Sequence, residues 1–212
     1  MMLKTKFIQE IYLKEINGGI MKKLIICLFA VCFIVACNSK PKTAVVSTQN
    51  TPKNSKILVA YFSATGNTAK VAQNLSKAIG ADIYEIKPQT LYTSEDLDWT
   101  NPNSRSSIEM KSQTARPGIV PENLSVSNYD TIYLGFPIWW GTAPVIVRTF
   151  LEKYDFSNKK IIIFATSGSS GIGNIDRDLK TSVSGSTDIV KGAVLNNNPS
   201  VEYLKEWSQT FK

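Results

Sequence analysis

From residue 56 onward, the hydrophobic pattern alternates between continuous apolar runs and segments whose apolar residues recur at helical spacing. Continuous apolar runs are typical of strands that are buried on both faces of a sheet. They predict strands at 57–62, 82–86, 131–136, 161–165 and 189–195, of which the second is short and the last is weaker. Such strands alternating with helices imply right-handed crossovers. We therefore predict one α/β domain over residues 56–212, built as a three-layer, doubly wound sheet of five parallel strands.

The expected helices are marked by apolar residues three and four positions apart. The first carries Val71, Leu75 and Ile79 and closes at Gly80, and the second opens at Pro144. The remaining helices are predicted from Ile175, Leu179 and Val183 after the N-cap Asn174, and from Leu204, Trp207 and Phe211. Because doubly wound folds bind ligands beyond the carboxyl ends of their strands, a site is expected in the loops that follow the strands.

The N-terminal 55 residues have a different pattern, which predicts export. Lys22-Lys23 precedes an uncharged apolar run of thirteen residues at 24–36, shorter than the roughly 20 residues of a membrane span. The run ends Ile34-Val35-Ala36-Cys37, which resembles the bacterial lipobox. We predict a lipoprotein signal peptide at 21–36, with Cys37 as the lipidated first residue of an exported protein anchored to a membrane of the cell envelope. A plain signal peptide or a short anchor helix is the alternative.

The segments on either side of this signal are predicted to lie outside any folded domain. Residues 1–20 precede Met21, which is the better start, so we expect them to be an untranslated leader read as protein. Residues 37–55 begin with the lipidated cysteine and continue as a polar, proline-containing stretch. This composition is typical of a flexible linker.

Composition narrows the chemistry of the domain. The 212 residues contain no histidine, and all three cysteines lie between residues 27 and 37. The domain therefore has no imidazole or thiol, which excludes cysteine and Ser-His-Asp hydrolases, zinc fingers and iron–sulfur sites. Without residues 1–37, which carry five lysines and two glutamates, the net charge falls from +7 to +4. The sequence has no cluster of lysines and arginines interleaved with aromatic residues, so we predict no nucleic-acid partner. We also predict neither a metal site nor a catalytic side chain.

Three predicted loops carry candidate chemistry. Residues 63–68 place hydroxyls and a glycine before a helix, a combination that binds a phosphate monoester but is neither a Walker loop nor G-x-G-x-x-G. Residues 137–141 contain two adjacent tryptophans, which either flank an aromatic ring or pack against segment 88–127. Residues 166–173 are small and polar, so their backbone can approach a ligand closely. The alternative is an ordinary surface loop.

Taken together and in this order, the three loops resemble those of the flavodoxin family over about residues 56–211. The resemblance implies the strand order 2-1-3-4-5 and a bound FMN. It assigns the FMN phosphate to Ser63, Ala64, Thr65, Gly66, Asn67 and Thr68. It places Pro137, Ile138, Trp139, Trp140 and Gly141 beside the isoalloxazine. It places Thr166, Ser167, Gly168, Ser169 and Gly171 near the pyrimidine edge of the ring. The positive charge and the export signal depart from the soluble, acidic electron carriers of this family.

The resemblance implies a redox protein that transfers electrons through bound FMN at a membrane surface, with a partner protein or a small molecule as acceptor. One alternative is an FMN-dependent NAD(P)H:quinone or nitro-compound reductase. Another, of a different class, is a binding module for a phosphate ligand without redox work. The connection 90–120 is long for this fold and is expected to contain a short helix within 102–114. It forms either a lid that brings Trp99 or Arg105 to the flavin or substrate, or a structural cap over one sheet edge.

Overall fold

The computed structural model describes residues 56–112 and 114–212. The sheet contains five parallel strands, β1 (Ile57–Tyr61), β2 (Asp82–Glu85), β3 (Thr131–Pro137), β4 (Lys160–Thr166) and β5 (Asp188–Val194), in the order β2-β1-β3-β4-β5. The predicted fold class and strand order are confirmed. The predicted leader, signal peptide, lipidated Cys37 and linker lie outside the described residues.

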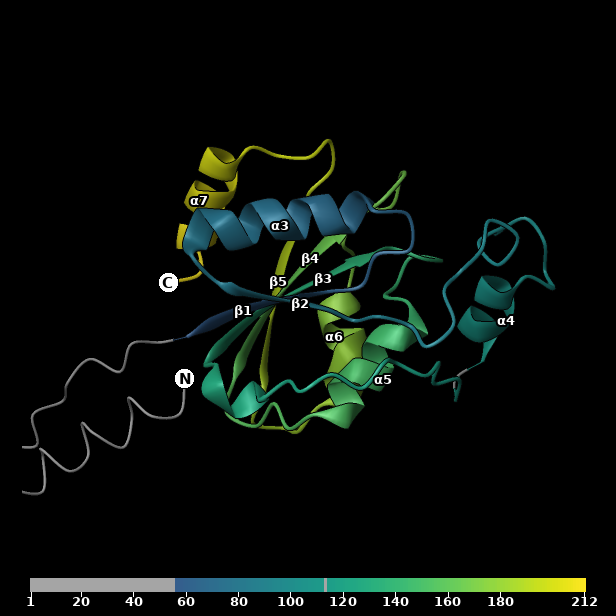
Figure 1. The fold of residues 1–212 in the computed structure, drawn as a ribbon, viewed down its shortest axis with the longest axis horizontal. Coiled ribbons are helices and arrows are strands. Elements are labelled where there is room, and N and C mark those ends of the chain that lie inside the picture. Colours follow the sequence, from purple (N-terminus) through teal and green to yellow (C-terminus); the bar gives the residue numbers. More distant parts are fainter. Residues whose placement is uncertain (1–55, 113) are drawn as a thin grey trace, which may run out of the picture. The chain divides into compact units, whose positions relative to one another are not determined.

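Helices cover both faces of this sheet (Figure 1). Helices α3 (Asn67–Ile79) and α7 (Val201–Gln209) lie on one face, and α5 (Val145–Lys153) and α6 (Ile175–Leu179) lie on the other. Short 3-10 turns occupy Val126–Asn128 and Lys180–Ser182. Within the described ranges, no helix is long and apolar enough to cross a membrane.

Alternate residues of the central strands build two separate cores. In β1, Leu58 and Ala60 face the α5 and α6 side, whereas Val59 and Tyr61 face the α3 and α7 side. Successive strand side chains point to opposite faces, so a strand with both faces covered must be apolar at every position. This explains why β1, β3 and β4 read as continuous apolar runs.

Three helix predictions differ from the structure at their ends. Helix α6 ends at Leu179 and tightens into a 3-10 turn, so Val183 lies beyond it in extended conformation. Helix α7 ends at Gln209, and Phe211 packs on Tyr133 and Trp207 from the following turn. Asn174 precedes α6 without a capping hydrogen bond from its side chain. Val183 and Phe211 are thus apolar residues that keep helical spacing beyond the end of the helical backbone.

The long β2–β3 connection folds as an excursion from the sheet. It contains α4 (Arg105–Lys111), the short helix expected within 102–114, whose N-cap Ser104 accepts a hydrogen bond from the Ser107 amide. Figure 1 shows α4 at the far right of the view, away from the helices that cover the sheet. The excursion returns through an antiparallel bridge between Pro88 and Ile119, shortly after the end of β2.

Candidate functional site

The loops after β1, β3 and β4 meet at the carboxyl edge of the sheet, where they line two adjoining cavities of about 530 and 520 Å³. Both cavities are lined by Thr65, Pro137, Ile138, Trp139, Ser167 and Gly168. The first, here the polar cavity, is also lined by Asn67, Lys70, Val71, Thr166 and residues 195–198. The second, here the tryptophan cavity, is also lined by Ala64, Leu97, Trp99, Ser106, Trp140, Ser169 and Ser170. Together they offer a polar end joined to an aromatic end.

The β1–α3 loop places unused polar groups at the start of α3. Gly66 is the N-cap residue with φ +84°, and no side chain caps the first amides of α3. Glycine adopts this left-handed conformation without steric cost. The Ser63 Oγ is buried and has no hydrogen-bond partner. A buried polar atom without a partner is unusual. Ser63 itself lines neither cavity, whereas Thr65, two residues on, lines both.

Two other hydroxyls of this loop differ in their surroundings. Thr65 is exposed, accepts a hydrogen bond from Asn67 Nδ2 at 3.3 Å and lines both cavities. Thr68 is 1% exposed, and its Oγ1 lies 2.8 Å from the Thr166 Oγ1. Thr68 lines neither cavity, and its side chain joins the β1 and β4 loops. Its assignment to the phosphate stays a prediction.

The β3 loop turns sharply at its two tryptophans. Trp139 and Thr142 exchange both backbone hydrogen bonds, at 2.9 and 3.0 Å, across a two-residue turn. The central residues Trp140 and Gly141 have φ values of +48° and +79°. Positive φ at both central positions defines a type I′ turn, which usually takes asparagine or glycine. The bulky Trp140 is therefore held in a conformation that it rarely adopts.

The two tryptophans have different environments. Trp139 packs edge-on against Phe62 and Tyr92, with distances between ring centroids of 5.6 and 5.4 Å. It also lines both cavities. Trp140 is 51% exposed and lines the tryptophan cavity. Packing against the β2–β3 segment and lining a ligand site were alternatives in the sequence, and Trp139 does both. Gly141 lies in the turn itself and lines neither cavity.

The β4 loop is held by a residue that the sequence did not single out. Asn196, just after β5, accepts a hydrogen bond from the Ser167 amide at 2.9 Å and donates one to the Ser167 carbonyl at 2.8 Å. The Ser167 hydroxyl accepts from the Ser170 amide at 2.8 Å. This arrangement fixes the backbone between the two cavities. Gly168 and Ser169 line cavities, whereas Gly171 does not.

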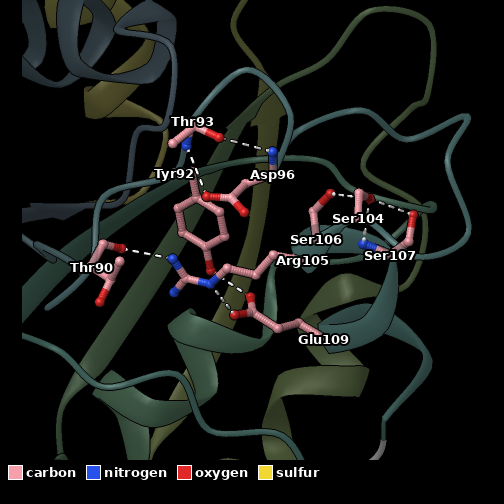
Figure 2. Close-up of polar contacts among 9 residues, drawn as sticks. All are labelled: Thr90, Tyr92, Thr93, Asp96, Ser104, Arg105, Ser106, Ser107 and Glu109. Carbon is pink, nitrogen blue, oxygen red and sulfur yellow. Dashed lines mark hydrogen bonds and ion pairs between the residues drawn. The ribbon is translucent and has the colours of Figure 1, made fainter.

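The excursion between β2 and β3 is organised around Tyr92 (Figure 2). Its hydroxyl donates to Glu109 Oε2 at 2.5 Å, and Arg105 Nε donates to Glu109 Oε1 at 2.7 Å. The Arg105 guanidinium also lies 4.0 Å from the centroid of the Tyr92 ring and donates to the Thr90 carbonyl at 2.8 Å. Burial, and secondly the hydrogen bond to Glu109, raise the pKa of Tyr92 above its ordinary value. The phenol therefore stays protonated as a donor.

Several lining residues escaped the sequence analysis. Leu97 and Ser106 belong to the excursion, as does Trp99, the residue that the lid alternative brings to the site. Lys70 stands one turn into α3, and residues 196–198 follow β5. The position of Asn196 after a predicted strand was a usable signal, because every carboxyl end of a parallel sheet opens on the same edge. Among the described residues, no cluster of three or more carboxylate, thiol or imidazole groups could hold a metal ion.

Fold and site geometry define a flavodoxin-like α/β protein, and comparison with known proteins agrees. The flavodoxin family model matches residues 56–211. A protein of Bacteroides uniformis, provisionally described as a flavoprotein, has 47% identity over 74% of this chain and 99% of that chain, with a TM-score of 0.69. One from Bacteroides eggerthii, described in the same terms, has 44% identity over 74% and 98%, also with a TM-score of 0.69.

A flavoprotein of Lactobacillus acidophilus, solved in complex with FMN, has 20% identity over 73% of this chain and 99% of that chain, with a TM-score of 0.51. At this identity the likeness shows the shared fold. No curated protein matches the chain. On the family match and the two Bacteroides structures, this chain belongs to the flavodoxin family.

Proposed function

We propose that the chain binds FMN across its two cavities and works as a flavin-dependent redox protein. The observation that carries the proposal is the junction of a polar cavity at the start of α3 with a cavity lined by tryptophans. FMN has the same polarity, with a phosphate at one end and an aromatic tricycle at the other. Each cavity alone is within the range of about 300–1,000 Å³ that small-molecule sites occupy.

The residues present fit the phosphate end of FMN. Thr65 and Asn67 line the polar cavity and, with the uncapped amides of α3, supply neutral donors, and the helix N-terminus favours an anion. The buried Ser63 hydroxyl lies in the same loop and would reach a phosphate only by turning into the cavity. Lys70 adds a positive charge on the lining of the same cavity. Thr68 supports this loop through Thr166 rather than by a side-chain contact of its own.

The other two loops fit the ring end. The segment Pro137–Trp140 lines the tryptophan cavity with apolar and aromatic surface, and Ser167 to Ser170 bring small side chains and exposed backbone. Bound flavin supplies the redox chemistry, while the protein orients it and controls access to it. Gly141 keeps the turn that presents Trp140, and Gly171 lies in the β4 loop outside the lining of both cavities.

Ligand competition tests the proposal. Titration of the apoprotein with FMN, riboflavin and inorganic phosphate should give tight binding of FMN, weaker binding of riboflavin, and competition by phosphate only at high concentration. Bound FMN should then be reducible by dithionite and reoxidised by an added acceptor. Binding of phosphate monoesters with no preference for a flavin would favour the non-redox binding module instead.

We also propose that the protein is an exported lipoprotein, anchored to a membrane of the cell envelope through Cys37. Support comes from the basic pair, the apolar run of thirteen residues and the sequence Ile34-Val35-Ala36-Cys37. Residues 38–55 would then tether the redox domain to the membrane. Metabolic labelling with a fatty acid should mark the protein, and Cys37→Ser should abolish the label.

A further inference from the structure

A third cavity, of about 510 Å³, lies at the amino edge of the sheet, and we call it the amino-edge cavity. Its lining includes the first residues of β1, β3 and β4, which are Ile57, Thr131 and Lys160. It also includes residues from the C-terminal ends of α3 and α7, two helices that lie side by side (Figure 1). None of its lining residues lines either cavity at the carboxyl edge. The amino-edge cavity is therefore separate from the site proposed for FMN.

The floor of the amino-edge cavity is mainly apolar. Tyr133 and Ile162 line it and are buried. Four partly buried apolar side chains that pack on the same core also line it, namely Ile57, Ala78, Ile79 and Phe211. Two hydroxyl groups of the lining already donate within the protein: Tyr133 donates to the Ser208 carbonyl at 3.3 Å, and Ser208 donates to the Lys205 carbonyl at 2.7 Å. The floor therefore offers a ligand apolar surface, whose removal from water is favourable.

Three lysines line the same cavity, and no carboxylate does. Lys160 is half-buried, and its Nζ donates to the Phe211 carbonyl at 2.6 Å, which leaves two of the three donors of the ammonium group. Lys205 in α7 and Lys212 after it are exposed. Within residues 56–112 and 114–212, none of these three lysines forms an ion pair with a carboxylate. Their positive charge is therefore available to an anion.

This lining selects the chemistry of a ligand. An anionic head is attracted by the lysines, and an apolar chain gains about fourfold in affinity for each methylene group that it buries. A small hydrophilic anion would use the lysines alone, and exposed charge pairs contribute little by themselves. A neutral chain would forgo the charges, and a cationic one would be repelled. The volume of about 510 Å³ is within the range of about 300–1,000 Å³ that small-molecule sites occupy.

We propose that the amino-edge cavity binds the apolar chain of an anionic amphiphile, whose head contacts Lys160, Lys205 and Lys212. A free fatty-acid anion and an anionic membrane phospholipid both have this chemistry. The inference goes beyond the proposed flavin function, because the cavity shares no lining residue with the FMN site. A phospholipid held here would turn the amino edge of the sheet toward the membrane, so that the FMN site at the carboxyl edge would face away from it.

The test begins with calorimetric titration of the full chain carrying Cys37→Ser, so that no lipid anchor contributes. The ligands are decanoate, octanoate, 1-decanol and decyltrimethylammonium, each below its micelle concentration. They are titrated into the parent protein, Lys205→Gln/Lys212→Gln and Ala78→Trp, which places a large side chain in the cavity lining. Lys77→Gln is the matched control, because Lys77 is an exposed lysine in the last turn of α3 that does not line the cavity. Comparison between variants cancels any binding by residues 1–55.

Decanoate should bind most tightly, and octanoate about tenfold more weakly because it buries two fewer methylene groups. The double lysine variant should weaken decanoate roughly threefold to twentyfold, Ala78→Trp should abolish its binding, and Lys77→Gln should leave it unchanged. Equal affinity for decanoate and octanoate would overturn the proposal, as would an equal loss in Lys77→Gln and in the double variant. FMN affinity should be the same in all variants, and failure of the chain to take up FMN would leave this inference standing.

Cosedimentation with vesicles then identifies the source of the amphiphile. The same proteins are mixed with vesicles of phosphatidylcholine alone and with vesicles that also contain phosphatidylglycerol. Binding to the anionic vesicles that is lost in Lys205→Gln/Lys212→Gln and kept in Lys77→Gln would assign the cavity to a membrane phospholipid. Binding of decanoate without any binding to vesicles would assign it to a free fatty-acid anion. If neither decanoate nor anionic vesicles bind the parent protein, the proposal is wrong.

Discussion

Removal of the Ser63 hydroxyl is expected to act in opposite directions on the apoprotein and on FMN binding. Within the part of the chain that the structure describes, Ser63 Oγ is buried and has no hydrogen-bond partner. Leaving such a group unsatisfied costs about 1–3 kcal/mol. Ser63→Ala removes that cost, so the apoprotein should be stabilised. Taking about 1 kcal/mol after the small loss of packing, the melting temperature should rise by roughly 2–4 °C for a domain of this size.

FMN binding should suffer from the same change. If Ser63 Oγ donates to the phosphate, the variant loses a hydrogen bond to a charged group, worth about 1.5–3 kcal/mol. This corresponds to a loss of roughly tenfold to a hundredfold in affinity. Riboflavin lacks the phosphate, so its affinity should hardly change. Isothermal titration with FMN and riboflavin, together with calorimetric melting of the apoprotein, measures all three effects.

Thr149→Val provides a matched control for Ser63→Ala. Among the described residues, Thr149 Oγ1 is also buried without a partner, but it lies in α5, outside the loops that follow the strands. The control should raise the melting temperature of the apoprotein by a similar amount and leave FMN affinity unchanged. The reasoning is refuted if Ser63→Ala lowers the melting temperature, or if it leaves FMN binding as strong as in the wild type.

Four other changes have defined outcomes. Thr65→Ala should weaken FMN by about tenfold to a hundredfold in titrations and spare riboflavin, because Thr65 is the exposed hydroxyl on both cavities; equal weakening of both ligands would speak against a phosphate contact. Gly141→Val should destabilise the protein by about 1–3 kcal/mol in urea unfolding, because φ is +79° there, and Gly141→Asn should be milder. Burial raises the pKa of Tyr92 above its ordinary value of 10.0 in the folded protein. The contribution of Tyr92 to the free energy of unfolding is therefore complete below pH 10.0 and is lost as the pH rises above it, because only the unfolded phenol then ionises. Tyr92→Phe should therefore flatten the alkaline fall in stability, and an unchanged slope would contradict this. Cys37→Ser should shift the protein from the membrane pellet to the soluble fraction, whereas undiminished pelleting would exclude Cys37 as the anchor.

Most of the fold could be predicted because its physical signals are local. Strands that are buried on both faces must be apolar throughout, and β1, β3 and β4 carry that pattern without interruption. Helix ends were less predictable, because Val183 and Phe211 keep helical spacing while their backbone has left the helix. Packing against the sheet, which has no sequence signature of its own, decides where such residues stop being helical.

The site was partly predictable for the same reason. Loops that follow strands in a parallel sheet share one edge, which brings Thr65, residues 137–140 and residues 166–170 together around the two cavities. The roles within these loops depend on three-dimensional contacts. Thr68 turns toward Thr166, 98 positions away in the sequence. Trp99 lines the tryptophan cavity from the excursion, and the sequence alone left open whether it would reach the site or belong to a structural cap.

The central claim is that this domain carries FMN, and the cofactor content of the purified protein tests it most directly. The protein is produced with and without residues 1–36, purified, and examined by its visible absorbance spectrum and by the mass of any released cofactor. Both forms should be yellow or become so on addition of FMN, and denaturation should release FMN in a ratio of about one per chain. A colourless protein that refuses added FMN in both forms would contradict the account.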